Sequence, residues 1–334
     1  MQNANKKSVF FIDQYTSCGL LILFILATAN VAQAETATDD KAELRVNAND
    51  YLTPSSNANG GSGYGIDTTI LSAPIDGSWR LYAGEYFAHE IEPAGEGTIG
   101  YSRATAGIAY QGDSVAADFA PTYNHHNSTE RVGAVGDVTW NIDSAWAVGG
   151  GGQLFSRDTP LRAMNAGITS DSYDLNAAFH QDDARDVRVE FDIMNFSDNN
   201  FRTDVSATDT EHLFSNSYFS FDGLVNAIES NDSKNEDRLY FNPEQDFLGK
   251  IGGRITQPLY HSDGYVYDHS VTIMPGVYWQ QNYGSSVAVE ARYDQSLHVG
   301  NDLDLGFGVD VTRQAADGVE ENSYTFLLNV AKRI

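Results

Sequence analysis

Apolar and polar residues alternate one by one along most of this chain. In the stretch VRVEFDIMNF (187–196), the odd-numbered residues up to position 193 are apolar, and Arg188, Glu190 and Asp192 stand between them. Because successive side chains of a β-strand point to opposite faces, this stretch predicts a strand with one apolar face and one charged face. A half-buried strand of a soluble protein has the same pattern, so the rest of the chain decides what each face meets.

The same alternation recurs throughout, and no helical periodicity of any length follows the first 34 residues. The pattern predicts about sixteen strands, each with one apolar and one polar face. They lie near residues 43–51, 64–74, 79–88, 98–110, 115–123, 130–141, 145–156, 171–180, 187–196, 201–211, 216–228, 247–258, 265–279, 285–297, 303–313 and 322–334.

The predicted links between these strands alternate between short and long. The short links are rich in Asp, Gly, Ser and Asn, as tight turns require. They fall at 75–78, 111–114, 141–144, 181–186, 212–216, 261–264 and 299–302. The longest of the others are 52–63, 157–170 and 229–246. Short links at one end and long links at the other are typical of an outer-membrane β-barrel, whose short turns face the periplasm together with both termini.

A soluble β-sandwich is the main alternative, because its strands also bury one face and expose the other. Sixteen strands in one antiparallel meander exceed the usual size of such a sheet. The apolar rows also end in aromatic residues near the turns, as at a membrane interface. These are Trp79, Trp140, Trp146, Tyr173, Phe179 and Trp279. The favoured fold class is therefore all-β: a transmembrane, antiparallel, up-and-down β-barrel with lipid outside and an aqueous lumen inside.

The N-terminus predicts export. Lys6 and Lys7 precede the apolar run CGLLILFILATANV, and the small residues Ala32 and Ala34 then suit cleavage of a signal peptide at 1–34. The alternative is a retained membrane anchor, but the run is shorter than the roughly 20 apolar residues that a helical span needs. The expected location is the outer membrane of a Gram-negative cell.

After cleavage, a short periplasmic lead-in at 35–42 would precede the barrel at 43–334, and the only cysteine, Cys18, would be lost. No disulfide is therefore expected despite export. The signal holds 2 of the 20 Lys and Arg residues and 1 of the 46 Asp and Glu residues, so 18 basic and 45 acidic residues remain, with a net charge of −27. Such a charge argues against binding nucleic acid or anionic membrane surfaces and favours cationic partners.

Several longer segments are more specific than the alternation. They are SAPIDGSWRLYAGEYF (72–87), ERVGAVGDVTW (130–140), SRDTPLRAMNAGITSDSYDL (156–175), SKNEDRLYFNPEQDF (233–247), YWQQNYGSS (278–286) and TRQAADGVEENSY (312–324). In this order they resemble the outer-membrane porin family that exports the biofilm polysaccharide poly-N-acetylglucosamine, over nearly all of the mature chain. The resemblance implies a sixteen-stranded barrel that passes a partly de-N-acetylated, and hence partly cationic, glucosamine polymer without any cofactor.

The resemblance also implies partners. Full-length exporters of this family carry a large periplasmic helical-repeat domain before the barrel, which docks the polymer and its deacetylase. Only residues 35–42 separate the expected cleavage site from the first strand here, so a separate periplasmic helical-repeat or deacetylase protein is an expected partner. The outer-membrane assembly machinery is another, although it commonly reads a C-terminal aromatic residue where this chain has Ile334.

Phasing each strand by its apolar row directs a set of charged side chains toward the lumen. The acids are Asp67, Asp118, Asp137, Asp174, Glu190, Asp192, Asp204, Asp222, Glu290, Asp294, Asp304 and Asp310, and the bases are Arg45, Arg80, Arg103, Arg131, Arg188, Arg202, Lys250, Arg254 and Arg292. The walls are thus expected to be mildly acidic. The candidate polymer path consists of Asp174, Glu190, Asp192, Asp222, Glu290, Asp294, Asp304 and Asp310.

The remaining negative charge falls mostly in the links. The candidate acidic outer mouth consists of Glu229, Asp232, Glu236, Asp237, Glu244 and Asp246, with Asp317, Glu320 and Glu321 on the same side. Rings of carboxylates select cations, so this mouth would draw a cationic chain outward. The alternative is a solvated loop surface that has no role in selectivity.

The segment 157–170 is long enough to fold over or into the channel. As a candidate constriction loop it carries Arg157, Asp158, Pro160 and Arg162, of which the first two are expected to pair and Pro160 to stiffen the turn. An ordinary surface loop is the alternative. Three inward aromatic residues are candidates either for stacking on sugar rings or for filling the wall: Tyr82, Tyr101 and Tyr278.

A hydrolase is disfavoured. His126 and Ser128 have a spacing that suits a nucleophile and its base, but they fall in a polar loop away from the lipid face. His125 and His126 are poor metal ligands, because adjacent side chains of a strand diverge. The predicted function is therefore a non-enzymatic pore for the amino-sugar polymer. The alternatives are a general or cation-preferring diffusion porin, or a barrel subunit that needs a separate periplasmic repeat protein.

Overall fold

The computed structural model confirms the predicted all-β barrel. It describes residues 41–53, 61–91, 98–126, 129–182, 184–233, 244–262, 264–316 and 318–334. The expected signal peptide and most of the expected lead-in lie outside these residues. No helix in the described ranges is long and apolar enough to cross a membrane.

Sixteen strands make up the wall, as the alternation predicts. They are β1 (Glu43–Thr53), β2 (Gly61–Leu71), β3 (Trp79–Ile91), β4 (Thr98–Gln111), β5 (Val115–His126), β6 (Thr129–Asn141), β7 (Trp146–Leu154), β8 (Ser170–Gln181), β9 (Arg185–Phe196), β10 (Phe201–Ser215), β11 (Ser220–Asp232), β12 (Gln245–Ser262), β13 (Tyr265–Gln280), β14 (Gly284–Val299), β15 (Leu303–Ala316) and β16 (Val319–Arg333). One short helix, α2 (Leu161–Asn165), interrupts the link between β7 and β8.

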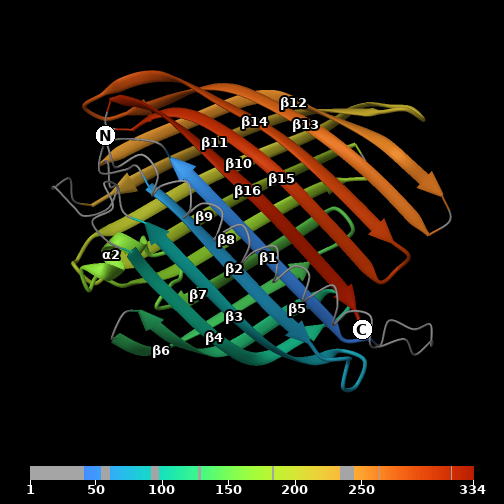
Figure 1. Ribbon diagram of the computed structural model, residues 1–334, viewed down its shortest axis with the longest axis horizontal. Coiled ribbons are helices and arrows are strands. Elements are labelled where there is room, and N and C mark those ends of the chain that lie inside the picture. Colours follow the sequence, from blue (N-terminus) through green and yellow to red (C-terminus); the bar gives the residue numbers. More distant parts are fainter. Residues whose placement is uncertain are drawn as a thin grey trace, which may run out of the picture.

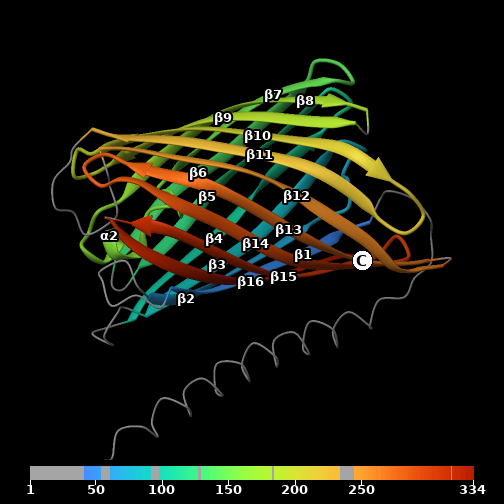
Figure 2. The same ribbon diagram turned by 90° about the horizontal axis from the view of Figure 1, so that it is seen from above.

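The strands form one closed antiparallel cylinder (Figures 1 and 2). Each strand pairs with its neighbours in the sequence, and β1 closes the sheet against β16 in a register that sets Val46 opposite Val330. Closure leaves no sheet edge with unpaired backbone groups, which is what a hydrocarbon environment demands.

The two ends of the cylinder differ. At one end, here called the short-turn rim, the chain termini meet: the Ile334 N–H donates to the Ala42 carbonyl at 2.7 Å. The turns of this rim are tight, and the Asp143 carboxylate caps one of them by accepting from the N–H groups of Ala145 and Trp146, both at 2.8 Å. The opposite end, the loop rim, carries the longer links, including the one that contains α2.

One predicted turn is misplaced. The segment 212–216 does not form the β10–β11 link, because β10 continues to Ser215 and the turn lies at 216–219. A β-bulge between His212 and Phe214 inserts one extra residue, which breaks the alternation that marked the end of the strand. The Asn216 side chain caps the true turn by accepting from the backbone N–H of Phe219 at 3.0 Å.

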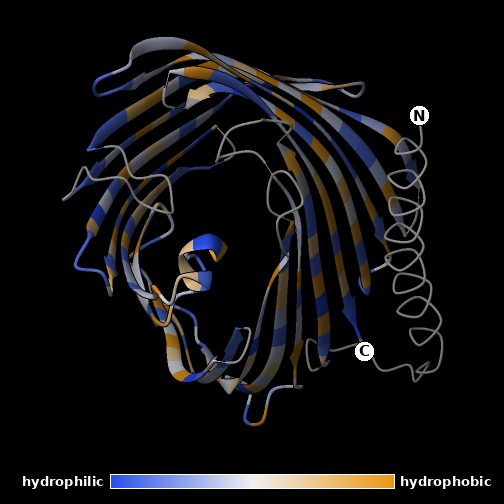
Figure 3. Ribbon diagram, turned by 60° about the vertical axis from the view of Figure 1, so that its left-hand side comes forward, coloured by the Kyte–Doolittle hydropathy of each residue, from blue (hydrophilic) through white to orange (hydrophobic). Residues whose placement is uncertain are grey.

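The inner and outer faces follow from α2, which lies inside the cylinder (Figure 3). Arg162 of α2 donates to Glu90 of β3 at 2.9 Å, so the face of β3 that carries Glu90 is the inner one. Residues paired in register share a face, so the pairing carries this assignment around all sixteen strands. In β9, Arg188, Glu190 and Asp192 are directed inward, and the apolar residues between them are directed outward.

The outer face carries aromatic residues near the short-turn rim, as expected for a membrane interface. The rings of Trp79 and Tyr110 lie 5.0 Å apart on β3 and β4, and those of Trp146 and Phe179 lie 4.8 Å apart on β7 and β8. Between the two rims this face is mainly apolar and exposed, which suits contact with lipid.

Candidate functional site: the charged lumen

The register places every predicted inward charge on the inner face. These residues are Asp67, Asp118, Asp137, Asp174, Glu190, Asp192, Asp204, Asp222, Glu290, Asp294, Asp304 and Asp310, with Arg45, Arg80, Arg103, Arg131, Arg188, Arg202, Lys250, Arg254 and Arg292. The lumen is therefore lined by both signs of charge. Its two sides arrange these charges differently.

Six carboxylates form one register row on the β5–β12 side, here called the carboxylate row. Asp118 pairs with Asp137, Asp174 with Asp192 and Asp192 with Asp204, while Gly151 links Asp137 to Asp174 and Ser230 links Asp204 to Asp246. Side chains opposite one another on paired strands stand about 5 Å apart, so the row presents closely spaced negative charge.

The carboxylate row runs from near the short-turn rim toward the loop rim. Asp118 is the fourth residue of β5, which starts at the short-turn rim, whereas Asp246 is the second residue of β12, which starts at the loop rim. Because strands of a barrel tilt relative to its axis, a row that crosses them at right angles rises as it goes around the wall. The carboxylate row thus runs obliquely along the wall of the lumen, from near the short-turn rim toward the loop rim.

The lower four members of the row have no cationic partner among the described residues: Asp118, Asp137, Asp174 and Asp192. Asp118 accepts from the Tyr82 hydroxyl at 3.1 Å, and Asp174 accepts from Asn176 at 3.4 Å. The gap at Gly151 brings two of these carboxylates together, because a Cβ there would lie 2.1 Å from Asp137 Oδ1 and 2.8 Å from Asp174 Oδ1. The alternation rule did not single out this glycine.

On the β11–β15 side, by contrast, several carboxylates are paired with cations, although Asp310 accepts from the Thr312 hydroxyl, at 2.7 Å, instead. Lys250 contacts Glu290, and Arg292 Nε donates to both oxygens of Asp294, at 2.8 and 2.9 Å. Asp304 lies 2.5 Å from His298 Nδ1.

Asp222 is also on this side and is nearly buried. It accepts from Arg254 Nη2 at 2.8 Å and lies 2.8 Å from His212 Nδ1. Asp222 therefore ties β10, β11 and β12 together, and its oxygens are engaged by the wall itself.

The link 155–169, here called the inward segment, reaches into the lumen from β7 and β8. Its near side is held by neutral, buried hydrogen bonds: Thr159 Oγ1 lies 2.6 Å from Ser170 Oγ and donates to the Ser156 carbonyl at 2.8 Å. Ala163 of α2 packs with Phe196, Ile168 and Met194 in a small apolar cluster. Sequence reasoning missed these anchors, because short polar residues in a link look like ordinary turn residues.

The far side of the inward segment is held by two ion pairs to β2 and β3. Arg157 Nη1 donates to Asp67 at 2.5 Å, and its guanidinium lies 5.1 Å from the centre of the Tyr86 ring. Arg162 donates to Glu90 at 2.9 Å. The segment therefore crosses part of the lumen, with a neutral attachment at one end and an electrostatic attachment at the other.

The predicted pairing of Arg157 with Asp158 is wrong, because Arg157 reaches Asp67 instead. Asp158 Oδ2 accepts from Ser156 Oγ at 3.0 Å and from Gln153 at 3.2 Å. Pro160 directly precedes α2, and its carbonyl accepts the Met164 N–H at 3.0 Å. Its fixed φ suits the residue before a first helical turn.

The predicted acidic outer mouth is only partly in the β11–β12 link. Asp232 and Asp246 belong to β11 and β12 and are buried on the inner wall, where Asp232 accepts from Asn200 at 3.1 Å and Asp246 from the Tyr278 hydroxyl at 2.8 Å. Glu229 lies on the outer face of β11, and Glu244 directly precedes β12. The strands are longer than their apolar rows, so the predicted link was too long.

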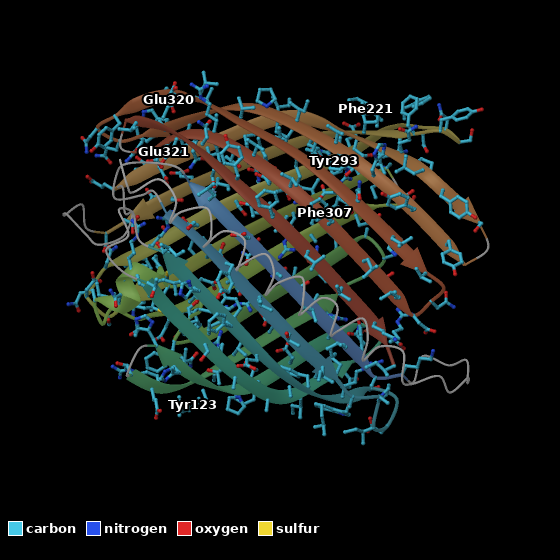
Figure 4. The ribbon with its side chains drawn as sticks, viewed as in Figure 1. Tyr123, Phe221, Tyr293, Phe307, Glu320 and Glu321 are labelled. Carbon is cyan, nitrogen blue, oxygen red and sulfur yellow. The ribbon has the colours of Figure 1, made fainter. Side chains whose placement is uncertain are left out.

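The other residues of the predicted mouth are placed as follows. Glu236, Asp237 and Asp317 lie outside the described residues. Glu320 and Glu321 are the second and third residues of β16 and lie at the loop rim (Figure 4). Glu320 contacts Arg313, so its charge is partly compensated.

The candidate aromatic residues all face the lumen, but they differ in access. Tyr101 and Tyr278 are buried, and the Tyr101 hydroxyl donates to Asn124 at 2.6 Å. They fill the wall. Tyr82 is partly exposed beside Asp118 and is the one of the three that can meet a solute in the lumen.

Of the residues considered for catalysis or metal binding, the two histidines face opposite sides of the wall. His126 ends β5 and faces inward, with Nδ1 2.9 Å from the Gly100 carbonyl, whereas His125 faces outward and Ser128 lies outside the described residues. Within the described part of the chain, no group of three or more His, Cys, Asp or Glu residues is arranged to hold a metal ion.

Comparison with known proteins agrees with this architecture. Residues 38–334 match the family described as the PgaA membrane beta barrel domain. The chain is 24% identical, over 285 residues, to the poly-beta-1,6-N-acetyl-D-glucosamine export proteins of Escherichia coli K12 and O157:H7. The match covers 84% of this chain but 35% of each relative, so the chain spans about a third of the length of these proteins.

A solved structure titled "Bacterial polysaccharide outer membrane secretin" matches with a TM-score of 0.83 and 22% identity, over 89% of this chain and 100% of that one. The likeness supports the same barrel fold. Because the family match covers most of the sequence, the chain belongs to the PgaA membrane beta barrel domain family.

Proposed function

We propose that this chain is an outer-membrane pore that passes partly de-N-acetylated poly-N-acetylglucosamine from the periplasm to the cell surface. In this orientation the short-turn rim and both termini face the periplasm, and the loop rim faces outward. The observation that carries the proposal is the carboxylate row, whose lower four members are free of cationic partners in the described structure. The relatives in E. coli, whose names describe export of this polymer, support it.

The row suits a polymer that carries amino groups at intervals. Each free ammonium group of the sugar chain binds a carboxylate, and carboxylates on directly paired residues of the row stand about 5 Å apart. Several weak sites of this kind let a long chain advance without being held at any one of them. Because the row runs toward the loop rim, movement along its four free members carries the polymer outward.

The inward segment sets how much of the lumen the polymer can use. Arg157 and Arg162 hold it against Asp67 and Glu90, so two wall carboxylates are occupied by the protein's own cations. An incoming ammonium group competes for the same carboxylates. The segment thus acts as a constriction that the cationic cargo itself loosens.

Residues 1–34 act as a cleaved signal peptide and 35–42 as a periplasmic lead-in, in keeping with their composition. A separate periplasmic helical-repeat or deacetylase protein supplies the polymer, and the outer-membrane assembly machinery inserts the barrel. No catalytic step and no cofactor enters the proposal.

Planar-bilayer recording of the purified mature barrel tests this function. Glucosamine oligomers added at the short-turn side should block the current in a concentration-dependent way, and fully N-acetylated oligomers of the same length should block much less. The two probes differ only at the amino nitrogens, which carry a positive charge in the first and a neutral acetyl amide in the second. Equal passage of neutral and cationic solutes, without any block, would indicate a general diffusion porin instead.

A further inference from the structure

Arg103 of β4 is a buried cation of the inner wall that has no carboxylate partner among the described residues. The residue is only 4% exposed. Its Nη1 donates to Gln153 Oε1 at 2.7 Å, whereas Nε and Nη2 make no hydrogen bond in the described structure and have almost no accessible surface. Burial of a charged group without a counter-charge is costly, and an unsatisfied buried donor in a native fold therefore points to a ligand or a movable cover.

The two unpartnered groups form one edge of the guanidinium. The N–H bonds of Nε and Nη2 run side by side, so together they match two oxygens of a carboxylate or phosphate. The same edge is used by two other arginines of this protein. Arg185 donates from Nε and Nη2 to the two oxygens of Asp209, and Arg254 donates from both atoms to Asp222. In Arg103 this edge has no hydrogen-bond partner within the described part of the chain.

The nearby carboxylates are engaged by other groups. Asp67 lies in the same register row as Arg103 but is paired with Arg157. Asp158 of the inward segment is linked to Arg103 through Gln153, which accepts from Arg103 and donates to Asp158 at 3.2 Å. Neither carboxylate therefore compensates the Arg103 charge by direct contact.

The inward segment covers this part of the wall. Its helix α2 lies inside the cylinder and contacts β4 (Figure 3). Between the segment and the wall lies a cavity of about 90 Å³, lined by Tyr101 and Arg131 from the wall and by Ser156 and Thr159 from the segment. No Asp or Glu of the described residues lines this cavity. The segment thus shields Arg103 from the lumen without placing a carboxylate against it.

A second cation stands two strands away in the same register row. Arg131 of β6 is opposite Asn124 of β5, which is opposite Arg103. The Arg131 guanidinium lies 5.6 Å from the centre of the Phe155 ring, at the start of the inward segment, and has no carboxylate partner in the described structure. Release of the segment would therefore open two uncompensated guanidinium groups to the lumen on one row.

We propose that Arg103 and Arg131 form an oxyanion-binding site that becomes accessible when the inward segment is released. The ligand is a small oxyanion, a phosphate or a carboxylate, with two oxygens that accept from Nε and Nη2 of Arg103. Because these atoms have almost no accessible surface while the segment is in place, the anion binds the released arrangement. A ligand that binds one of two states shifts the population toward that state, so oxyanions favour the open pore.

The first experiment records single channels of the purified protein while inorganic phosphate replaces chloride at constant ionic strength. At ten times its dissociation constant, phosphate should raise the ratio of open to closed time by about tenfold. Arg103→Lys keeps the charge but loses the paired donors, so its response should be about twofold or less. Arg188→Lys, at another lumen arginine, is the matched control and should respond like wild type. An equal response of wild type and Arg103→Lys would overturn the proposal.

The second experiment follows the modification of each arginine by phenylglyoxal with mass spectrometry. Arg103 should react slowly in the wild-type protein and roughly tenfold faster in Arg157→Ala with Arg162→Ala, in which the segment loses its far attachment. Phosphate should slow the reaction of Arg103 in that variant and leave the exposed Arg188 unaffected. A rate at Arg103 that neither the double variant nor phosphate changes would contradict the proposal.

These outcomes are separate from those of the proposed function, because the oxyanion site depends on the inward segment and not on the cargo. A barrel that glucosamine oligomers do not block would refute the proposed function, and its response to phosphate would still decide the oxyanion site. The modification experiment keeps Arg103 in place, so it decides the site even where Arg103→Lys fails to assemble.

Discussion

The carboxylates on the two sides of the lumen differ in whether they have cationic partners. On the β5–β9 side, Asp118, Asp137, Asp174 and Asp192 share one register row without a cationic partner in the described structure. On the opposite side, Lys250, Arg254 and Arg292 hold Glu290, Asp222 and Asp294 in ion pairs. A paired carboxylate has its lone pairs engaged and its charge compensated, so the free carboxylates of the first side offer more binding capacity to a mobile cation than these pairs do.

The two ion pairs of the inward segment also engage lumen carboxylates. Asp67 and Glu90 are occupied by Arg157 and Arg162, which come from a segment rather than from the wall. The difference matters because both members of a wall pair are fixed in the strands, whereas a segment pair would be released if the segment moved. In the proposed function, the lumen thus has a free track formed by the four unpaired carboxylates, a fixed structural side and a releasable constriction.

Charge reversal on the free track should have the largest effect. Asp174→Lys with Asp192→Lys replaces two negative charges by two positive ones at neighbouring register positions. Each unit charge a few ångströms away contributes about 1 kcal/mol even in water, so binding of glucosamine oligomers should weaken by roughly a hundredfold or more. The measurement is the concentration that blocks half of the bilayer current.

The matched control, Asp174→Asn with Asp192→Asn, removes the two negative charges at the same positions without adding positive ones. Its affinity for glucosamine oligomers should lie between that of wild type and that of the lysine variant. An equal half-blocking concentration of oligomer in all three proteins would show that the carboxylate row does not bind the oligomer.

Removal of the segment pairs should have the next largest effect. In Arg157→Ala with Arg162→Ala, Asp67 and Glu90 lose their partners and the inward segment loses its far attachment. Each partly exposed pair contributes about 1 kcal/mol or less, so the population with the segment released should rise by roughly tenfold. Single-channel recording should show longer or larger openings.

The conservative variants Arg157→Lys and Arg162→Lys serve as the control, because they keep the charge but lose the planar guanidinium. They should behave like wild type or show a smaller increase. If the alanine variants open no more than wild type, the neutral anchors at Ser156 and Thr159 hold the segment by themselves.

A single neutralisation on each side gives a smaller but sharper comparison. Asp192→Asn removes a free carboxylate, and Asp294→Asn removes one that Arg292 engages. Both variants change the lumen charge by the same amount. The first should weaken oligomer block by roughly fivefold, which corresponds to about 1 kcal/mol, and the second by less than about twofold. Equal effects would mean that net charge, rather than pairing, controls binding.

The alternation of residues predicts the wall well and the site less well. The faces of β9 follow directly from its sequence, because a period of two is the geometry of the strand itself. The turn at 212–216 is misplaced because a bulge adds one residue, and no local signal distinguishes Leu213 from an ordinary member of the row. Asp232 and Asp246 look like loop acids because the strands continue past their apolar rows.

Long-range partners are beyond the reach of the local pattern. Arg157 pairs with Asp67, 90 positions away, and Arg162 pairs with Glu90, 72 positions away. Nothing near Arg157 in the sequence separates this outcome from the pairing with Asp158. The free or paired state of each carboxylate follows from how the closed wall brings distant strands together, so it appears only with the register.

The smallest effect on oligomer block is expected from a change at Gly151, the gap in the carboxylate row. In Gly151→Ala, the new Cβ would lie 2.1 Å from Asp137 Oδ1, which belongs to a side chain that can turn away. The barrel should assemble normally, and spreading of Asp137 from Asp174 should weaken oligomer block by about twofold, less than 1 kcal/mol.

Gly252→Ala is the contrasting control, because its Cβ would lie 1.9 Å from the backbone oxygen of Ile273, which cannot move without disturbing the β12–β13 ladder. Assembly, followed as the shift in gel mobility on heating, should fail only in the second variant. Unchanged block in a well-assembled Gly151→Ala barrel would show that convergence of the two carboxylates does not contribute to cation binding.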